Sequence, residues 1–308
     1  MMRWSFLPLF LAGFLLPFTA HAQAWTQPRG EAYVKVSHGR STAAEQYDFE
    51  GAVLPYADNV DGDAFFDRSL YLYGEYGLSD SFTLVALLPY KRLTVEDAAF
   101  EYTTGGIGSI MVGGRYNLKP LVGGAGTPQT LAVNAMFTLP AGYTRNFAPS
   151  IGPGQVDVQA SLNYGVSLFP LPAYAQVGAG YRVRTDAFGL SGSTECQPGR
   201  DVNCVVDAQP AYDNEWLVNA EIGSTPQPWI LVQGLLQGVF SANAPTAQTS
   251  FTASNPIATR QRFLKLGGGV TLYPIPQIGL SVQGFATPYG RNTIRSTDWF
   301  FGVEYLLR

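Results

Sequence analysis

Charged side chains are scarce in this chain of 308 residues. Asp, Glu, Lys and Arg make up 14% of it, against about 25% in ordinary soluble domains. The balance is acidic, with 19 basic against 23 acidic residues. An acidic chain has no electrostatic basis for binding nucleic acid, so we expect no such partner.

Long apolar runs are also lacking after residue 22. A helix needs roughly 20 apolar residues to cross a bilayer, and no later segment provides them. Any part of the mature chain that lies in a membrane must therefore use strands. This pattern excludes transporters built from membrane-spanning helices.

Histidine is also scarce, which limits the catalytic sites that the chain could contain. Only His38 remains after residue 22. Its neighbour Ser37 would point to the opposite face of a strand, so the two cannot form a dyad. A distant serine could still approach His38, which leaves a lipid-modifying enzyme as the less favoured alternative. We expect no enzymatic activity and no cofactor.

The two cysteines, Cys196 and Cys204, share the polar segment SGSTECQPGRDVNC. Two close cysteines in an exported chain predict a disulfide within a loop. A metal site would need further Cys or His ligands nearby, and the sequence has none there. We therefore expect no metal at this position.

Carboxylates gather in the segment DNVDGDAFFD, between residues 58 and 67. Such a cluster could bind calcium, but its spacing departs from the twelve-residue calcium loop and lacks the terminal Glu. A solvated surface loop is the favoured interpretation. The four side chains are Asp58, Asp61, Asp63 and Asp67.

The N-terminal segment has the three parts of a secretory signal peptide. Arg3 precedes an apolar stretch from Phe6 to Phe18, and residues 20–22 read Ala-His-Ala. This pattern predicts cleavage before Gln23, with residues 1–22 removed after export. Residues 23–308 then form a single domain, and the export machinery is an expected partner.

Alternation of apolar and polar residues dominates the rest of the chain. It runs through the segment from Gly154 to Arg184 on both sides of "FPLP", as in strands whose successive side chains point to opposite faces. The runs are longer than the roughly 5 to 6 residues of typical soluble strands. They predict strands that span a membrane.

Twelve such strands can be placed, and short connections such as GLSDS and YPIPQ alternate with long ones. Outer-membrane barrels have an even number of strands, short periplasmic turns and long extracellular loops. We expect an all-β, antiparallel up-and-down transmembrane barrel in the bacterial outer membrane, with both termini periplasmic. A soluble two-sheet sandwich is the alternative, but it does not explain why short and long connections alternate along the chain.

The expected strands begin near Glu31, Ser69, Phe82, Ser109, Thr130, Gln155, Ala173, Glu215, Trp229, Arg262, Ile278 and Trp299. The expected long loops lie near 40–68, 91–105, 140–154, 185–212, 241–260 and 287–297.

The tight connection "FPLP" fixes the register of one hairpin. It places Asp157 opposite Arg184 and Gln159 opposite Arg182, on the polar face that would line the lumen. A structural ion pair is the favoured interpretation of Asp157 with Arg184, and a constriction that selects solutes by charge and size is the alternative. The candidate lumen residues are Arg115, Asp157, Gln159, Arg182, Arg184, Glu221 and Lys265.

Two segments interrupt the polar inner face. FTLVALLPY is apolar on both faces, and in WILVQGLLQGVF the presumed lumen face carries Leu231, Leu235 and Val239 between glutamines. Either these strands face the other way or the lumen contains an apolar strip.

Five segments resemble, in this order, a family of outer-membrane proteins named for the meta-pathway of phenol degradation. They are YGLSDSFTLVALLPY, GGIGSIMVGGRYNL, FTLPAGY, GPGQVDVQASLNYGVSL and YAQVGAGYRVR. The resemblance implies a transporter of aromatic or other hydrophobic compounds.

We therefore expect a passive channel or transporter for small hydrophobic or aromatic molecules. Its expected partners are the solute, outer-membrane lipids and the barrel assembly machinery. A plugged barrel that acts as a surface-binding or structural module is the alternative.

Overall fold

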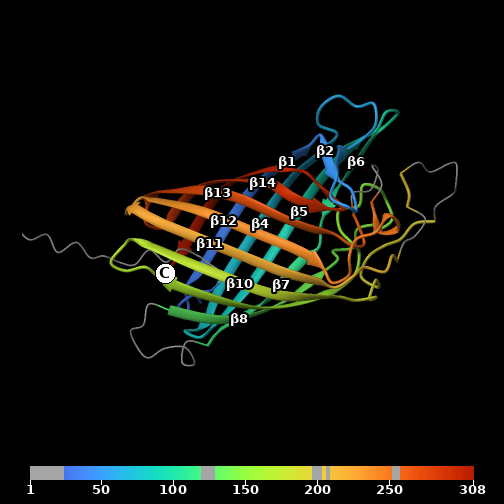
Figure 1. Ribbon diagram of the computed structural model, residues 1–308. Coiled ribbons are helices and arrows are strands. Elements are labelled where there is room, and N and C mark those ends of the chain that lie inside the picture. The colour runs from blue at the N-terminus through green and yellow to red at the C-terminus, as the bar shows by residue number, and fades with distance from the viewer. Residues whose placement is uncertain (1–23, 119–128, 196–202, 206–208, 252–256) are drawn as a thin grey trace, which may run out of the picture.

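The computed structural model describes residues 24–118, 129–195, 203–205, 209–251 and 257–308. They form one closed antiparallel β-barrel (Figure 1). The expected signal peptide, residues 1–22, lies outside the described residues. In the described part of the chain, no helix combines the length and hydropathy needed to cross a membrane.

The barrel contains twelve spanning strands, one of which is built from two pieces, because β6 and β7 both pair with β5. The pairing of β1 with β16 joins the two ends of the chain and closes the ring. The spanning strands are β1 (Ala32–Ala43), β4 (Phe65–Ser79), β5 (Phe82–Glu96), β6 (Glu101–Ile107) with β7 (Ile110–Asn117), β8 (Gln129–Leu139), β9 (Asp157–Ser167), β10 (Ala173–Arg184), β11 (Glu215–Gln227), β12 (Ile230–Ser241), β13 (Arg262–Ile275), β14 (Ile278–Arg291) and β16 (Thr297–Leu307).

The expected architecture of twelve antiparallel strands is confirmed. Tight connections such as 80–81 and 168–172 gather at one end, which we call the short-turn end. Figure 1 shows the last strand ending at this same end, with the large loops at the other, which we call the long-loop end.

Two of the expected long loops are wrong. The segment expected to be a loop near 91–105 continues β5 and β6 as a paired ribbon, closed by residues 97–100. Thr94 and Thr103 hydrogen-bond across this ribbon at 2.9 Å, and such cross-strand pairs stabilise strands beyond the barrel rim. Near 287–297, β14 runs on to Arg291, so the connection to β16 is short.

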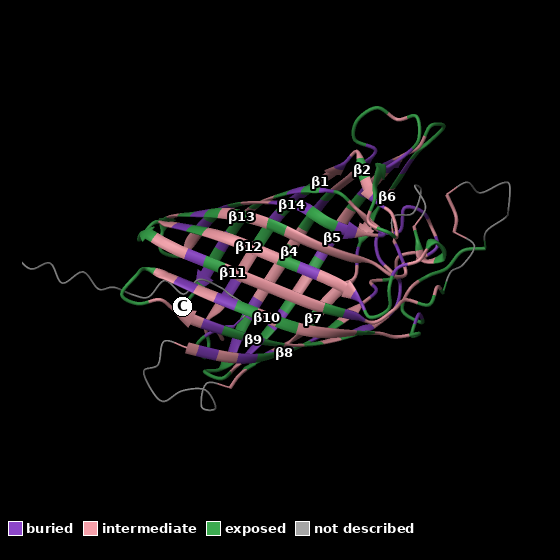
Figure 2. Cartoon of the chain, in the orientation of Figure 1, coloured by how far each residue is buried: buried purple, intermediate pink, exposed green. Residues whose placement is uncertain are grey.

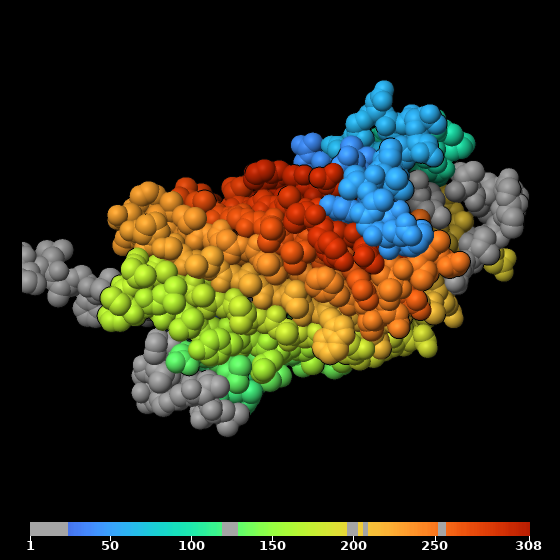
Figure 3. All heavy atoms as spheres, in the orientation of Figure 1, coloured from blue at the N-terminus to red at the C-terminus, as the bar shows by residue number. Residues whose placement is uncertain are grey.

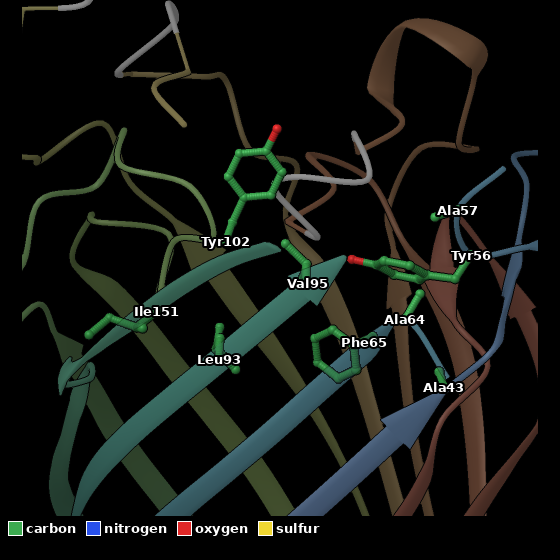
Figure 4. Close-up of a cluster of buried hydrophobic side chains, with 9 residues drawn as sticks. All are labelled: Ala43, Tyr56, Ala57, Ala64, Phe65, Leu93, Val95, Tyr102 and Ile151. Carbon is green, nitrogen blue, oxygen red and sulfur yellow. The ribbon is translucent and has the colours of Figure 1, made fainter. Parts of the chain in front are cut away.

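The long-loop end carries a small sheet of β2 (Glu45–Tyr47), β3 (Val53–Pro55) and β15 (Thr293–Ile294), and a short 3-10 helix, η1 (Ala247–Thr249). Beneath the loops lies a cluster of buried apolar side chains (Figure 4). Its members are Ala43, Tyr56, Ala57, Ala64, Phe65, Leu93, Val95, Tyr102 and Ile151. Burial of this cluster holds the loop 44–64 against the ends of β4, β5 and β6.

The two faces of the barrel wall differ in polarity, and burial changes along each strand accordingly (Figure 2). The outward row of β9 includes Val158, Leu162 and Tyr164, all of them exposed. The inward row of the same strand includes Asp157 and Asn163, both buried. Figure 3 shows neighbouring strands packed into a continuous outer surface. The wall therefore turns its apolar side to the surroundings and its polar side to the lumen.

Candidate functional site

The hairpin of β9 and β10 has the register that its turn predicts. Asp157 lies opposite Arg184, and Gln159 lies opposite Arg182. The Arg184 Nε donates to Asp157 Oδ1 at 3.0 Å, and the Arg182 Nη2 donates to Gln159 Oε1 at 3.2 Å. Directly opposed residues of a strand pair share a face, so these four side chains lie together on the lumen side.

Glu215, the first residue of β11, connects the two arginines. Its Oε2 lies 2.8 Å from Arg182 Nη1, and its Oε1 lies 3.1 Å from Arg184 Nη1. The ring of Tyr212 also lies 4.7 Å from the Arg184 guanidinium carbon, close enough for a cation–π interaction. The resulting group of two acids and two bases is neutral and held on three adjacent strands.

Arg115 lies deeper, toward the short-turn end. Its Nη2 is 2.9 Å from Glu75 Oε1, and its Nε donates to Asn134 Oδ1 at 2.9 Å. Arg115 and Glu75 are both almost completely buried. Its Nη1 donates to the carbonyl oxygen of Trp25 at 2.5 Å.

This last contact reveals a feature that sequence reasoning missed: residues 24–27, which we call the inner segment, lie inside the short-turn end of the lumen. The Ala24 amide donates to Gln176 Oε1 on β10 at 3.1 Å, and the Gln27 amide donates to Thr83 Oγ1 on β5 at 2.8 Å. Only a segment inside the ring can contact the inner faces of strands so far apart around it. The inner segment therefore crosses the lumen.

Two glycines accommodate this path. A Cβ placed on Gly165 would lie 2.4 Å from the Trp25 ring, and one on Gly77 would lie 2.0 Å from the Pro28 carbonyl oxygen. Any larger residue at either position would collide with the N-terminal chain. These glycines were the available sequence signal, but glycine is common in barrel strands and points to no partner by itself.

Glu221 on β11 lies beside the inner segment. Gln176 Nε2 and Gln233 Nε2 donate to its two carboxylate oxygens at 2.8 Å and 2.6 Å, and Tyr174 also donates to it. The ring of Tyr174 packs edge-on against Trp25, with centroids 5.8 Å apart. Glu221 therefore belongs to the polar group around the inner segment, to which Gln176 and Tyr174 connect it.

Lys265 lies on β13, two strands away from β11, and pairs in the lumen with Asp298 of β16. The seven candidate residues therefore do not form one ring. Asp157, Gln159, Arg182 and Arg184 form one group, Arg115 and Glu221 lie near the inner segment, and Lys265 lies apart.

The lumen also has apolar stretches. Leu235 lies opposite Glu221 and Val239 opposite Leu217, so both share the inner face of β12. Leu231 is buried against Tyr174, with Trp25 packed beside them. On β5, Pro89 and Leu93 face inward as well and line a cavity.

This cavity lies inside the barrel between β4 and β10 and has a volume of about 440 Å³. Its lining includes five charged residues, Asp67, Lys91, Asp157, Arg182 and Arg184. It also includes six large apolar residues, Phe65, Leu93, Met111, Ile151, Ile257 and Ile294. None of the three apolar β12 residues lines it.

Tyr143, in the loop between β8 and β9, fixes the chain that borders the cavity. Its hydroxyl lies 2.8 Å from Ser109 Oγ and accepts a hydrogen bond from the Gly154 amide at 2.8 Å. Burial raises the pKa of Tyr143 above its ordinary value, because the charged phenolate is disfavoured away from water.

The residues considered for catalysis and for calcium binding form no such site in the part of the chain that the structure describes. His38 is exposed on the outward face of β1, while Ser37 is buried on the inner face. Asp67 belongs to β4 and lies 3.4 Å from Lys91, and no group of three potential metal ligands occurs among the described residues. Cys196 lies outside the described residues, so the disulfide with Cys204 stays a prediction.

A closed barrel with an apolar outer face and a polar lumen defines a class of protein. Only closed barrels satisfy the backbone hydrogen bonds of membrane-spanning strands, and twelve antiparallel strands with long loops at one end are typical of bacterial outer-membrane proteins. The chain is an outer-membrane β-barrel.

Comparison with solved structures agrees with this class. A structure described as the COG4313 outer membrane channel from Pseudomonas putida F1 matches with a TM-score of 0.68 at 14% sequence identity, covering 92% of this chain and 98% of that chain. The NanC porin matches with a TM-score of 0.50 at 7% identity, covering 88% and 98% respectively.

At such low identities these similarities establish the fold. No known family profile matches the sequence, and no curated protein matches it significantly. The resemblance to the family named for phenol degradation therefore stays a prediction.

Proposed function

We propose that the protein is a passive channel for small hydrophobic or aromatic molecules across the outer membrane. The observation that carries this proposal is the lumen cavity of about 440 Å³, whose lining combines apolar and charged side chains. Binding sites for small molecules are typically concave and mostly apolar, with a few polar groups that orient the ligand. No energy source is needed, because the solute gradient drives passage.

In this proposal the mature chain begins at Gln23, and the short-turn end faces the periplasm. The long-loop end then faces outside, which agrees with the usual arrangement of outer-membrane barrels. Surrounding lipid covers the outward apolar rows, and the export and barrel assembly machineries deliver and insert the chain.

Uptake by whole cells tests the proposal. Bacterial cells depleted of their general porins are expected to accumulate a radiolabelled small aromatic solute faster when they express this chain. Cells that express an unrelated barrel of the same size serve as the control. Equal uptake by the two kinds of cell would contradict the proposal.

A plugged barrel that acts as a surface-binding module is the second candidate. Two observations favour it: the inner segment lies in the short-turn end, and the apolar cluster packs the loops at the long-loop end. Shortening the loop between Asp186 and Ala211 would abolish binding of a surface partner in this case, whereas channel function requires that uptake persist.

A further inference from the structure

The ion pairs of the lumen share an asymmetry: the basic member is the more exposed one. In the pair of Arg182 with Glu215 the exposed fractions of the side chains are 24% and 3%. In the pair of Lys265 with Asp298 they are 25% and 3%. Lys91 and Asp67, at 25% and 14%, follow the same order.

The asymmetry has a structural cause. The short carboxylate side chains stay near the wall, where neutral donors also bind them: Gln155 Nε2 donates to Asp157 at 2.9 Å, and Gln261 Nε2 donates to Glu215 at 3.3 Å. Lys and Arg have long stems that carry the charged group away from the backbone. The surface that a solute meets is therefore cationic, although the charges balance.

Arg182 retains capacity to bind an anion. Its Nη1 is used by Glu215, whereas its Nη2 donates to the neutral oxygen of Gln159. Its Nε is buried and has no hydrogen-bond partner among the described residues. Nε and Nη2 form one edge of the guanidinium, and such an edge binds a carboxylate through two parallel hydrogen bonds.

The same cavity offers an apolar surface for the rest of a ligand. Arg182 and Lys91 line it together with Met111, Ile257 and Ile294, which are only half-buried. A neutral hydrocarbon would leave the cationic edge of Arg182 unused, and a fully polar anion would leave the apolar lining residues uncovered. A molecule that has both an apolar body and one acidic group can contact both kinds of residue.

We propose that the cavity binds small molecules with one carboxylate on an apolar or aromatic body. The carboxylate displaces the Gln159 amide and binds the Nε–Nη2 edge of Arg182, while the body packs against Met111, Ile257 and Ile294. This inference deepens the proposed function, on which it rests, by naming the class of solute.

Calorimetric titration of the folded protein in a nonionic detergent tests the inference without requiring passage. The probes are 4-propylbenzoate and its neutral analogue 4-propylbenzamide, which have nearly the same shape. We expect the benzoate to bind about tenfold more tightly than the benzamide, because a charge-assisted pair of hydrogen bonds to Arg182 adds that much affinity. Equal affinities would overturn the inference.

Three variants sharpen the test. Arg182→Gln is expected to reduce the preference for benzoate to about twofold or less, because the charged edge is lost. Gln159→Ala, which keeps Arg182 in place, is expected to strengthen benzoate binding, because the competing acceptor is removed. Arg295→Gln is the control, since Arg295 pairs with Glu45 in the exposed loops. Weaker benzoate binding by Gln159→Ala would contradict the inference even if Arg182→Gln fails to fold.

The inference and the proposed function can fail separately. Preference for benzoate without any uptake by cells would uphold the binding site and contradict the channel. Uptake of aromatic solutes with equal affinities for benzoate and benzamide would uphold the channel and contradict the carboxylate site.

Discussion

Arg182 and Glu215 lie directly opposite each other on β10 and β11, with Arg182 Nη1 2.8 Å from Glu215 Oε2. The pair spans the loop 185–214, so strand pairing and not local sequence brings the two residues together. Glu215 also holds Arg184, so it connects the two arginines that line the cavity.

Replacing Glu215 with Gln should destabilise the barrel. The change removes the charge of a carboxylate shared by two arginines, so Arg182 loses its charged partner while Arg184 keeps Asp157. Loss of such charged hydrogen bonds costs on the order of 2–3 kcal/mol. Urea unfolding in micelles, followed by tryptophan fluorescence, measures this loss. Glu45→Gln is the matched control, because its exposed pair with Arg295 should contribute less than about 1 kcal/mol. Similar losses for both variants would argue against a special role for Glu215.

The inner segment should limit the conductance of the barrel. Gly165→Val places a side chain where the Trp25 ring lies, so we expect the segment to leave the lumen and single-channel conductance to rise several-fold. Trp25→Ala should act in the same direction. Gly189→Ala is the control, because no atom lies within 4 Å of a Cβ at that position. Unchanged conductance in both lumen variants would show that the segment does not obstruct passage.

The cationic lumen surface predicts selectivity for anions. Under a potassium chloride gradient, the reversal potential of the wild type should indicate preference for chloride, because the exposed charges are those of Lys91, Arg182 and Lys265. Arg182→Glu should shift the preference toward potassium, and Arg295→Glu should leave it unchanged. Preference for potassium in the wild type would contradict this reading of the lumen.

His38 should be dispensable. It lies on the outward face of β1, opposite Leu70 and Phe301, where lipid surrounds it. We expect His38→Leu to fold and to take up solutes like the wild type, as judged by heat-modifiable migration and by the uptake assay. A phospholipase activity that disappears in this variant would instead support the enzymatic alternative.

The strands were predictable from the sequence because a wall between lipid and water imposes a strict two-residue period. The structure begins strands at Phe82, Ala173, Glu215, Arg262 and Ile278, the same residues that the alternation indicated. The tight turn "FPLP" also fixed its hairpin register, because so short a connection allows few pairings.

Contacts across the lumen were not predictable in this way. The inner segment precedes the first strand, and no period or turn links Trp25 to Gly165 or Arg115. The cavity likewise depends on how β4 and β10 face each other across the ring, which strand order alone does not specify. Whether a side chain points inward or outward follows from the alternation in its own strand. Which residue it contacts across the lumen depends on how the whole barrel closes.

The most direct test of the channel is planar-bilayer recording of the refolded, heat-modifiable protein, with and without small aromatic solutes. We predict small, stable current steps that aromatic solutes reduce, because both pass through the cavity beside Arg182. A correctly folded protein that conducts no ions, even after Gly165→Val, would contradict the channel and favour a plugged barrel.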